Sequence, residues 1–384
     1  MYLRTYAQID LDAIKYNIDN TKSRLQDGVK LLGVIKADAY GHGAVKIARE
    51  FEDDFDFFGV ACIEEALELT DAGIKTPLLI LGYVSPEDFE EIVKYDIRIP
   101  IFHEEDAKAL SDEAVKQGKT VPFHFCLDTG MSRIGFQADD ESADLCAEIA
   151  KLPNIEAEGI FSHFATADEA SLDKALAQQK VFETFCEKLE ARGVNIPIKH
   201  INNSAGIMNF DKQFNMCRMG IILYGLYPSS EVDKSLLDIR PAMKWVTSIS
   251  HLKTLAAGRE ISYGGEFLTR HETDIATIPV GYADGYPRCL SGIGEVLVGG
   301  KRVKIAGRIC MDQFMIDVSG IDGVEIGSEV VLVGTQGGET LTMEEVSEKA
   351  HSFNYELPCR ITRRVPRVYI KNGEIDEVIK HIKR

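Results

Sequence analysis

The stretch Val34-Ile35-Lys36-Ala37-Asp38-Ala39-Tyr40-Gly41-His42-Gly43 joins a short apolar run to a turn rich in glycine and small residues. The run, residues 31–35, is bounded by turn residues and is typical of a buried strand. Lys36 follows at the end of this strand, where burial favours the neutral amine that reacts with an aldehyde to form an imine. Many strand-end lysines simply reach solvent, so the meaning of Lys36 depends on the rest of the chain.

The composition is that of a globular protein with room for two domains. The 384 residues are long for one domain, and the 45% hydrophobic and 27% charged residues are ordinary for a globular chain. The formal net charge of −18 argues against nucleic-acid binding, which requires a basic surface. It also means that local donors must hold any anionic cofactor.

The cysteines and the termini restrict the location. The eight cysteines form no C-x-x-C pair and no His/Cys cluster with zinc spacing, so we expect no metal site. They are scattered through apolar runs, which is typical of buried free thiols in a reducing compartment. The N-terminus has no signal-peptide core and no run of 18 apolar residues is present, so we expect no membrane span. These features predict a cytoplasmic protein.

The first part of the chain alternates short apolar strands with helical patterns, which predicts an α/β fold. Eight strands in parallel βα units with short connections predict a (β/α)8 TIM-type barrel over residues 1–240. The expected strands are residues 31–35, 57–62, 78–81, 97–102, 121–127, 157–162, 198–201 and 216–219. The expected helices include residues 63–72, 86–94, 104–117, 141–151 and 171–192.

After a linker at residues 229–240 the pattern changes to short strands separated by glycines. The dipeptides Gly299-Gly300 and Asn372-Gly373 are typical of tight turns between antiparallel strands. Residues 343–352 give the one helical pattern in this part. The sequence therefore predicts a second, mostly β C-terminal domain over residues 241–384.

Polar residues follow several of the predicted barrel strands, and the C-terminal ends of barrel strands carry active sites and often a phosphate site. We expect Ser204, Gly220 and Ile221 to form the phosphate site, because a hydroxyl and two backbone N–H groups would converge there and glycine permits close approach. Taken singly, each such residue has an ordinary structural explanation as a cap, an ion pair or a packed side chain. The strand-end residues are Lys36, Asp128 to Gly135, Ser162-His163-Phe164, Asn202-Asn203-Ser204 and Arg218 to Ile221.

The decapeptide around Lys36 resembles the cofactor-lysine motif of the alanine racemases, which are fold-type III enzymes that use pyridoxal 5'-phosphate (PLP). The resemblance continues across almost the full chain. Its further motifs are Asp128-Thr129-Gly130-Met131-Ser132-Arg133, Arg259 to Gly265 with the letters REISYGG, Gly281 to Tyr286, Gly307 to Asp312, and Asn354 to Cys359.

The resemblance implies roles for residues of the first domain. Lys36 would bind PLP covalently, and Arg218 would face the pyridine nitrogen. Because arginine has no acceptor and stays protonated, that nitrogen would remain unprotonated and PLP would be a weaker electron sink, which favours returning the proton. His163 would lie near the cofactor and bond to the arginine. The residues matched to phosphate contacts are Tyr40, Ser204, Gly220, Ile221 and Tyr355.

The resemblance also implies a two-base mechanism. Racemisation needs a base on each face of the planar carbanion, and Lys36 and Tyr263 match these bases. In the family the tyrosine reaches the lysine of the partner subunit, so we expect a homodimer with composite active sites. The residues matched to substrate binding are Arg133, Met311 and Asp312. Those matched to the site entrance are Asp168, Tyr282, Arg288, Arg308 and Phe353.

One position departs from the family pattern. Many members carry a carbamylated lysine two residues before the aspartate of the D-T-G-M motif, and this lysine orients the arginine that matches Arg133. Cys126 occupies that position here, and a thiol cannot carry a carbamate. We expect a bound anion such as chloride, or direct bonds to cofactor and substrate carboxylate, to orient Arg133 instead.

The expected function is interconversion of L-alanine and D-alanine, which supplies D-alanine for peptidoglycan. A serine or broad-specificity racemase is an alternative, although Tyr355 crowds the position of a larger side chain. A fold-type III decarboxylase would place an acidic residue where Arg218 stands. A non-catalytic PLP carrier usually lacks a β domain.

Overall fold

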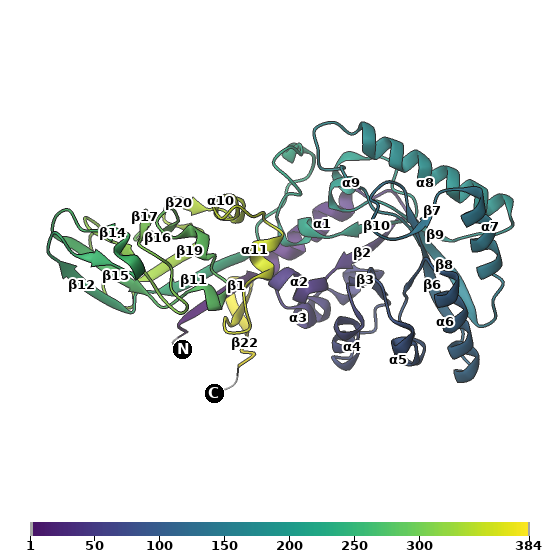
Figure 1. The fold of residues 1–384 in the computed structure, drawn as a ribbon, viewed down its shortest axis with the longest axis horizontal. Helices are drawn as coiled ribbons and strands as arrows, with labels where there is room; N and C mark the ends of the chain where they lie inside the picture. The colour runs from purple at the N-terminus through teal and green to yellow at the C-terminus, as the bar shows by residue number, and fades with distance from the viewer. Residues whose placement is uncertain (1–2, 383–384) are drawn as a thin grey trace. The chain divides into compact units, whose positions relative to one another are not determined.

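The computed structural model describes residues 3–382. The chain forms two compact units (Figure 1). The α/β unit comprises residues 15–39 and 43–240, and the β unit comprises residues 3–14, 40–42 and 241–382. Helices α1 (Leu11–Arg24) and α2 (Lys36–Gly41) each contain residues of both units.

The α/β unit contains all eight predicted strands in the expected order. The strands are β2 (Lys30–Val34), β3 (Phe57–Val60), β4 (Leu78–Ile80), β5 (Pro100–Ile101), β6 (Val121–Asp128), β8 (Ile155–Phe161), β9 (Ile198–His200) and β10 (Met216–Met219). The helices are α3 (Ala44–Glu50), α4 (Ile63–Asp71), α5 (Phe89–Tyr95), α6 (Glu104–Gln117), α7 (Asp140–Ile149), α8 (Asp173–Ala191) and α9 (Ser204–Asn209). Helices α4 to α8 lie outside the strands (Figure 1).

The strands of this unit form two parallel sheets. One has the order β10-β2-β3-β4, and the other has the order β5-β6-β8-β9 with β7 (Phe136–Gln137) beside β6. Backbone hydrogen bonds of Arg98 to Leu78 and Ile80, both 2.9 Å, join β4 to the segment before β5. The N–H of Arg218 donates to the carbonyl of Asn202 at 3.0 Å where β10 follows β9. The α/β class is confirmed. Closure of the eight strands into one continuous barrel stays a prediction.

Local sequence explains the helices. Helix α6 has the predicted bounds, and it buries Ala107, Leu110, Ser111 and Ala114, whose spacing of three and four residues defines one helical face. The start of the helical segment at 86–95 follows from its cap. The Ser85 hydroxyl accepts a hydrogen bond from a backbone N–H two residues later, and proline occupies the first helical position.

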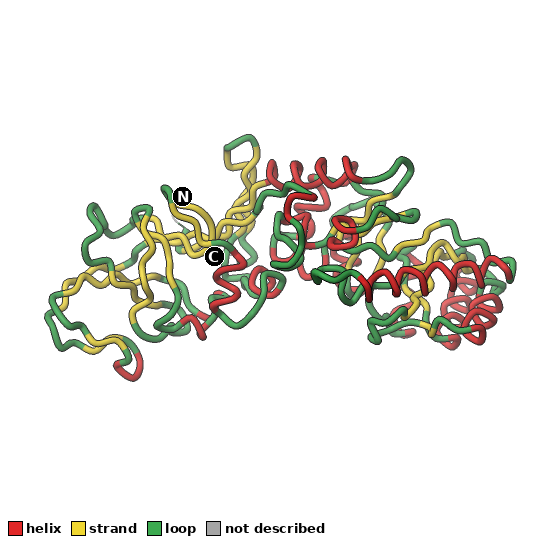
Figure 2. The backbone as a smooth tube through the Cα atoms, turned by 90° about the horizontal axis from the view of Figure 1, so that it is seen from above, coloured by secondary structure: helices red, strands yellow, loops and turns green. Residues whose placement is uncertain are grey.

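The β unit is built around one large sheet, whose strands dominate this part of the tube in Figure 2. The sheet order is β12-β15-β18-β17-β16-β19-β11-β1-β21-β22, with β20 beside β19. Its strands are β1 (Thr5–Asp10), β11 (Met243–Ser248), β12 (His251–Leu255), β15 (Thr273–Ile278), β16 (Glu295–Val298), β17 (Lys301–Ala306), β18 (Phe314–Asp317), β19 (Glu329–Gln336), β20 (Glu339–Leu341), β21 (Arg367–Lys371) and β22 (Glu374–Ile379). Strands β13 (Glu260–Ile261) and β14 (Phe267–Leu268) form a separate hairpin.

Aromatic side chains form part of the core of this unit. Trp245 and Phe314 are 0% exposed, and the ring of Tyr286 lies 5.7 Å from the first and 5.2 Å from the second. Burial of rings of this size dominates core energetics. The helices of the unit are α10 (Met343–Lys349) and α11 (Glu356–Cys359).

Both predicted tight turns are confirmed. Gly299 and Gly300 have φ values of 56° and 75° and join β16 to β17, which pair antiparallel. Asn372 and Gly373 have φ values of 54° and 76° and join β21 to β22. Two successive positive φ values are the signature of a type I′ turn, whose twist matches the strands.

The sequence prediction was wrong or incomplete in several places. The apolar pattern at residues 245–255 predicts a single strand, but these residues form two strands, β11 and β12. The one-turn helix α11 was not predicted. Strand β1 was also missed, because it pairs with β11 and β21, which lie more than 200 residues away along the chain.

The cysteines are only partly buried, contrary to the expectation. Four of the eight are buried, whereas Cys289 and Cys359 are exposed, and all eight are free thiols. Among residues 3–382, no group of His, Cys, Asp or Glu side chains is arranged to hold a metal ion. Within the same residues, every helix is too short or too polar to cross a bilayer.

Candidate active site

The turn after β2 is a left-handed helix. Ala37, Asp38, Ala39 and Tyr40 have φ angles between 51° and 54°, which L-residues rarely adopt in succession. Each such residue costs about 1–2 kcal/mol relative to the right-handed conformation. Strain of this kind persists where the surrounding structure enforces it, and it is concentrated at functional sites. The strained residues directly follow Lys36.

Carboxylates hold this turn in place. Glu65 accepts hydrogen bonds from the backbone N–H groups of Ala37 and Ala61, each at 2.7 Å. Asp38 accepts from the N–H of Ala44 at 2.8 Å, which ties the turn to helix α3. Sequence reasoning missed Glu65 because it lies in α4, on the next βα unit, and contacts the turn only through the fold.

The end of the turn is fixed within the β unit. Gly41 has a φ of 78°, and a Cβ atom there would lie 2.2 Å from the carbonyl oxygen of Pro358, so only glycine fits. Arg367 Nε, on strand β21, donates to the carbonyl of Gly41 at 2.8 Å. The segment that carries Tyr40 is therefore set by the β unit.

Tyr40 is packed among aromatic rings. It is 8% exposed, and its ring lies 6.2 Å from that of Tyr355, which lies 5.6 Å from that of Phe353. Burial, with a smaller contribution from Cys359, raises the pKa of Tyr40 above its ordinary value. The phenol therefore stays protonated and acts as a hydrogen-bond donor.

Arg218, on strand β10, is a buried cation whose acceptors are neutral. It is 3% exposed and donates at 2.8–3.2 Å to the carbonyls of Ser162, His200 and Ile201 and to the Nδ1 atoms of His163 and His200. Within residues 3–382, these contacts all involve Nη1 or Nη2. Burial lowers the pKa of Arg218 to about 10, so the guanidinium stays charged at neutral pH. A buried cation without an anion is unfavourable, so another electron-rich group would stabilise it.

A chain of buried hydrogen bonds leads away from Arg218. The guanidinium donates to His200 Nδ1 at 3.0 Å, so the His200 proton resides on Nε2 and points to His124 Nδ1 at 2.9 Å. His124 Nε2 then donates to the carboxylate of Glu158 at 3.1 Å. Two nitrogens of Arg98 bond the same carboxylate at 3.1 and 3.2 Å. The donors and acceptors of this chain are matched when both histidines are neutral.

The pKa shifts agree with that assignment. Burial is the main cause that lowers the pKa values of His124, His163 and His200, and the charge of Arg218 adds to it. Burial alone would raise the pKa of Glu158, but the hydrogen bonds from His124 and the Arg98 guanidinium outweigh it and lower that pKa to about 2. The cluster is therefore a set of neutral imidazoles between a cation and an anion.

Two further residues shape this cluster, and both were missed from the sequence. Gly159 lies opposite His124 in the sheet, and a Cβ there would lie 2.4 Å from His124 Nδ1. Gln178, on helix α8, donates to the carbonyl of His163 at 3.0 Å and accepts from the N–H of Ala165 at 2.9 Å. It therefore fixes the loop that presents His163 to Arg218.

Three of the predicted phosphate residues, Ser204, Gly220 and Ile221, lie together in the α/β unit. Ser204 begins α9, which Asn203 caps by accepting from the N–H of Gly206 at 2.9 Å. The Ser204 hydroxyl accepts from the N–H of Gly220 at 3.0 Å. Ile221, adjacent to Gly220, is 1% exposed and begins a short 3-10 helix. The Gly220 N–H is thus already used by Ser204, while the Ser204 hydroxyl keeps its own proton, which it can donate to an anion.

The loop with Arg133 is ordered by Asp128, which accepts from the N–H groups of Gly130 and Ser132 at 2.9 Å each. Arg133 itself is exposed. Burial raises the pKa of Cys126 to about 12, so it is a neutral thiol and supplies no negative charge to Arg133. An anion near Arg133 stays a prediction.

Tyr263 lies on a tight turn between β13 and β14 and is 70% exposed. The preceding Ser262 has a φ of 68°, and its hydroxyl donates to the carbonyl of Arg308 at 2.7 Å. The Arg308 guanidinium pairs with the Glu266 carboxylate. The turn is thus firmly held, while the side chain that it presents points to solvent.

The other predicted substrate and entrance residues divide between the units. Tyr282 is 42% exposed and donates its N–H to the carbonyl of Cys310 at 3.2 Å, beside Met311, which is 53% exposed. Phe353 is 59% exposed, and Arg288 is also exposed. Asp168 belongs to the α/β unit, where burial, followed by two nearby glutamates, raises its pKa.

The comparisons with known proteins are decisive. The alanine racemase N-terminal domain family matches residues 9–228, and the alanine racemase C-terminal domain family matches residues 242–369. The chain belongs to the alanine racemase family. It is 44% identical to alanine racemase 1 of Clostridium acetobutylicum over 98% of both chains, and 46% identical to the alanine racemase of Clostridium tetani over 96% of both.

Solved structures of alanine racemases have the same fold. The alanine racemase of Clostridium difficile 630 has a TM-score of 0.96 at 41% identity, with 100% of each chain covered. That of Bacillus anthracis with bound L-Ala-P has a TM-score of 0.93 at 38% identity, over 99% of this chain and 98% of that chain. Alanine racemases are PLP-dependent isomerases.

The residues present fit this cofactor. Lys36 lies at the end of β2, the Ser204 hydroxyl can donate to a phosphate, and Arg218 is a buried cation with only neutral acceptors in the described chain. These residues would supply an attachment point, a phosphate contact and a donor to a ring nitrogen.

Proposed function

We propose that this chain interconverts L-alanine and D-alanine, with Lys36 and Tyr263 as the two bases. The observation that carries the proposal is a strand-end lysine in the same unit as a buried arginine without an acidic acceptor, in a chain that matches the alanine racemase family over nearly its full length. An arginine in this position distinguishes a racemase from a decarboxylase, where an acidic group would strengthen the electron sink.

Each protein residue of the proposed site has a separate role in proton transfer or in holding the cofactor. PLP, when bound through Lys36, would acidify the α-proton of the amino acid. Arg218 offers only N–H donors, so the acceptor that it faces stays unprotonated. Lys36 removes or delivers the α-proton at its Nζ atom on one face, and Tyr263 does so at its phenolic oxygen on the other. The neutral His163 accepts from Arg218 and adds no charge to the site.

Binding follows from the remaining polar groups. Ser204, Gly220, Ile221 and the Tyr40 hydroxyl would hold the phosphate. Tyr355 would limit the space for the substrate side chain, since its ring is packed against neighbours at 5.6 and 6.2 Å. The substrate groups near this space would be Arg133, Met311 and Asp312. An anion such as chloride would orient Arg133, because Cys126 is neutral.

We further propose a homodimer whose active sites combine Lys36 of one subunit with Tyr263 of the other. Tyr263 is 70% exposed, Phe353 59%, Met311 53% and Tyr282 42%. This exposure leaves the four side chains accessible to a partner subunit. The backbone of the turn that carries Tyr263 is firmly held, so the side chain can enter a partner subunit without a change in the conformation of this turn.

The product would serve peptidoglycan synthesis, which uses D-alanine. Eight free thiols favour a reducing compartment, and we propose a cytoplasmic location.

Chiral chromatography of L-alanine, L-serine, L-lysine and L-ornithine after incubation with PLP-loaded protein tests the activity. D-alanine should form fastest, without an amine product. Faster formation of D-serine or a basic D-amino acid would still indicate racemisation, but it would refute the proposal that Tyr355 limits the size of the substrate side chain. Amine products would indicate a decarboxylase, and no product would indicate a non-catalytic PLP carrier.

A further inference from the structure

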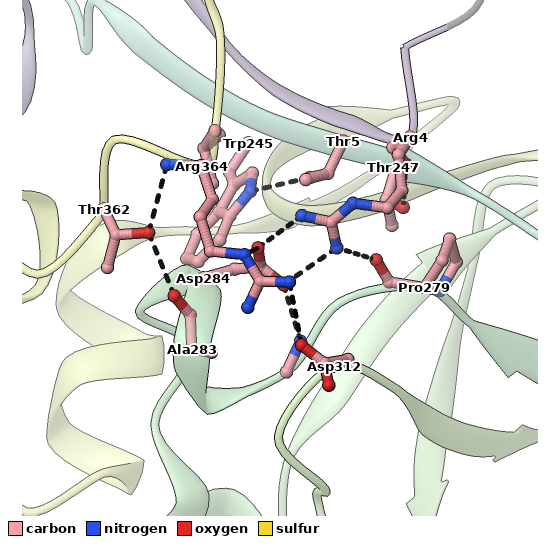
Figure 3. A network of polar contacts seen from close by, with 12 residues as sticks. Arg4, Thr5, Trp245, Thr247, Pro279, Ala283, Asp284, Asp312, Thr362 and Arg364 are labelled. Carbon is pink, nitrogen blue, oxygen red and sulfur yellow. Dashed lines mark hydrogen bonds and ion pairs between the residues drawn. The ribbon is translucent and has the colours of Figure 1, made fainter. Parts of the chain in front are cut away.

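A fully buried carboxylate, that of Asp284, lies in the β unit two residues after Tyr282, and Figure 3 shows its polar contacts. Asp284 is 0% exposed, and Arg4 donates to both of its oxygens and to the carbonyl of Pro279. The N–H of Gly281 also donates to this carboxylate, at 3.0 Å. A buried charge with this many partners is strongly fixed, and removing one partner is costly.

Arg364 connects this buried carboxylate to a second, exposed one. Its Nε lies 3.6 Å from Asp284, and its Nη2 donates to Asp312 at 2.8 Å. Arg364 is 35% exposed, whereas Asp312 is 51% exposed. The network consists of two arginines and two aspartates, Arg4, Arg364, Asp284 and Asp312, so its positive and negative charges cancel (Figure 3).

Backbone contacts join the loops on which these side chains lie. The N–H of Ala283 donates to the carbonyl of Met311 at 3.0 Å, next to Asp312. The Thr362 hydroxyl donates to the carbonyl of Ala283 at 3.0 Å, and the Thr362 N–H donates to the carbonyl of Asp284 at 3.1 Å. These hydrogen bonds hold the loops around residues 283, 311 and 362 together.

We propose that Arg364 is a positioning residue for the substrate, which acts by holding and neutralising Asp312; the proposal rests on the proposed function. A half-exposed carboxylate near the substrate path would repel the carboxylate of an approaching amino acid. Pairing with Arg364 cancels that charge and restricts the Asp312 rotamer. Asp284, held by Arg4, keeps the guanidinium oriented, and the planar fork of arginine reaches both carboxylates in a way that an ammonium group does not.

Steady-state kinetics of the PLP-loaded protein test this role. We expect Arg364→Gln to raise the KM for L-alanine and D-alanine equally, by about tenfold, with kcat changed less than about threefold, because one charge-assisted hydrogen bond is lost and the proton-transfer groups are intact. Arg364→Lys should give an intermediate KM. The matched control Arg302→Gln removes an arginine of similar exposure, 32%, that pairs with Glu339 and Glu345, and it should leave KM unchanged.

A double-mutant cycle with Asp312→Asn separates a direct role from an indirect one. If Arg364 acts through Asp312, adding Arg364→Gln to Asp312→Asn should change KM by less than about twofold. Losses that multiply, or a fall in kcat confined to one enantiomer, would overturn the proposal. Thermal unfolding of the same four proteins should show non-additive Tm changes, and additive changes would also overturn it. If the wild type does not racemise alanine, the proposed function and the substrate role fail together, while the unfolding data still report the pairing.

Discussion

The α/β unit buries the polar residues around Arg218, whereas the β unit exposes most of its predicted site residues. Arg218 and His200 are 3% and 0% exposed and have their partners inside the same unit. Tyr263 and Phe353, in the other unit, are 70% and 59% exposed. The first group of residues has its hydrogen-bond partners within one unit, and the second presents side chains that the described chain does not cover.

The two parts of the predicted site are held in place in different ways. The buried cluster depends on matched donors and acceptors, because an unsatisfied polar group in a core costs about 1–3 kcal/mol. The exposed part depends on stiff backbone turns, such as that at Ser262, which place a side chain without enclosing it. The comparison therefore predicts that changes in the first part affect stability, and changes in the second affect catalysis.

The largest expected effect is directional and belongs to the exposed part. Tyr263→Phe removes only a hydroxyl from an exposed ring, so the fold should be unaffected. Removal of the α-proton from L-alanine should slow by about 10²–10⁴-fold, because one general base is lost, whereas removal from D-alanine should change far less. Solvent deuterium exchange into each enantiomer measures this. Equal losses in both directions would count against Tyr263 as the second base.

The next largest effect concerns pH and the buried part. Burial lowers the pKa values of His124 and His200 in the folded protein. Below the ordinary histidine pKa near 6.5, these two side chains therefore take up protons in the unfolded chain but not in the folded one. The stability from keeping them neutral is present above that pH and is lost as the pH falls. These two histidines alone should lower the free energy of unfolding by about 3 kcal/mol per pH unit well below pH 6.5, and His163, whose pKa is lowered in the same way, adds to the slope.

Denaturant titrations between pH 7 and 5.5 check this slope. The control variant His271→Gln removes an exposed histidine of the β unit that lies outside this hydrogen-bond chain, and it should leave the slope as it is. A free energy of unfolding that is constant over this range would contradict the assignment of two neutral, buried imidazoles.

A smaller effect is expected where the chain passes from one unit to the other. Gly41→Ala places a Cβ 2.2 Å from the carbonyl of Pro358, whereas Gly28→Ala, at a similar φ of 81°, meets no atom within 4 Å. Both variants carry the strain of a positive φ, and Gly41→Ala should lose about 1–3 kcal/mol more because of the clash. Equal free energies of unfolding would show that the β unit does not clamp this turn.

The smallest effect should come from the far end of the hydrogen-bond chain. Glu158→Gln weakens the bonds to His124 and Arg98 and should cost about 1–3 kcal/mol at pH 7. Because the folded pKa of Glu158 is lowered to about 2, this difference is full above the unfolded value near 4.5 and shrinks as the pH falls below it. The exposed Glu148→Gln is the control, with an expected change below about 0.5 kcal/mol. A cost that is independent of pH would contradict the lowered pKa.

Local patterns were sufficient for much of the fold. Apolar runs bounded by turn residues located every strand of the α/β unit except the two-residue strand β7, and the dipeptides at 299–300 and 372–373 located two hairpins. These features depend on neighbouring residues alone. The polar residues after the strands also pointed to one cluster, and the structure places His163 and Arg218 3.2 Å apart.

What the sequence did not reveal depends on distant contacts. The left-handed turn after Lys36 contains no glycine until its end, so local propensity argues against it. The partners of Asp284 lie 280 and 80 residues away in Arg4 and Arg364, and no periodic pattern links them. A histidine between two phenylalanines in a buried strand, at His124, was the one available signal of the internal hydrogen-bond chain.

Subunit complementation tests the central claim, the composite site with two bases, most directly. Lys36→Ala and Tyr263→Phe proteins, each of which should form D-alanine at least about 100-fold more slowly than the wild type, are unfolded together, refolded and assayed with L-alanine. If each site combines Lys36 of one subunit with Tyr263 of the other, a mixed dimer has one intact site, and random mixing should restore about one quarter of the wild-type activity. Absence of any recovery, although mixed dimers have formed, would contradict the account.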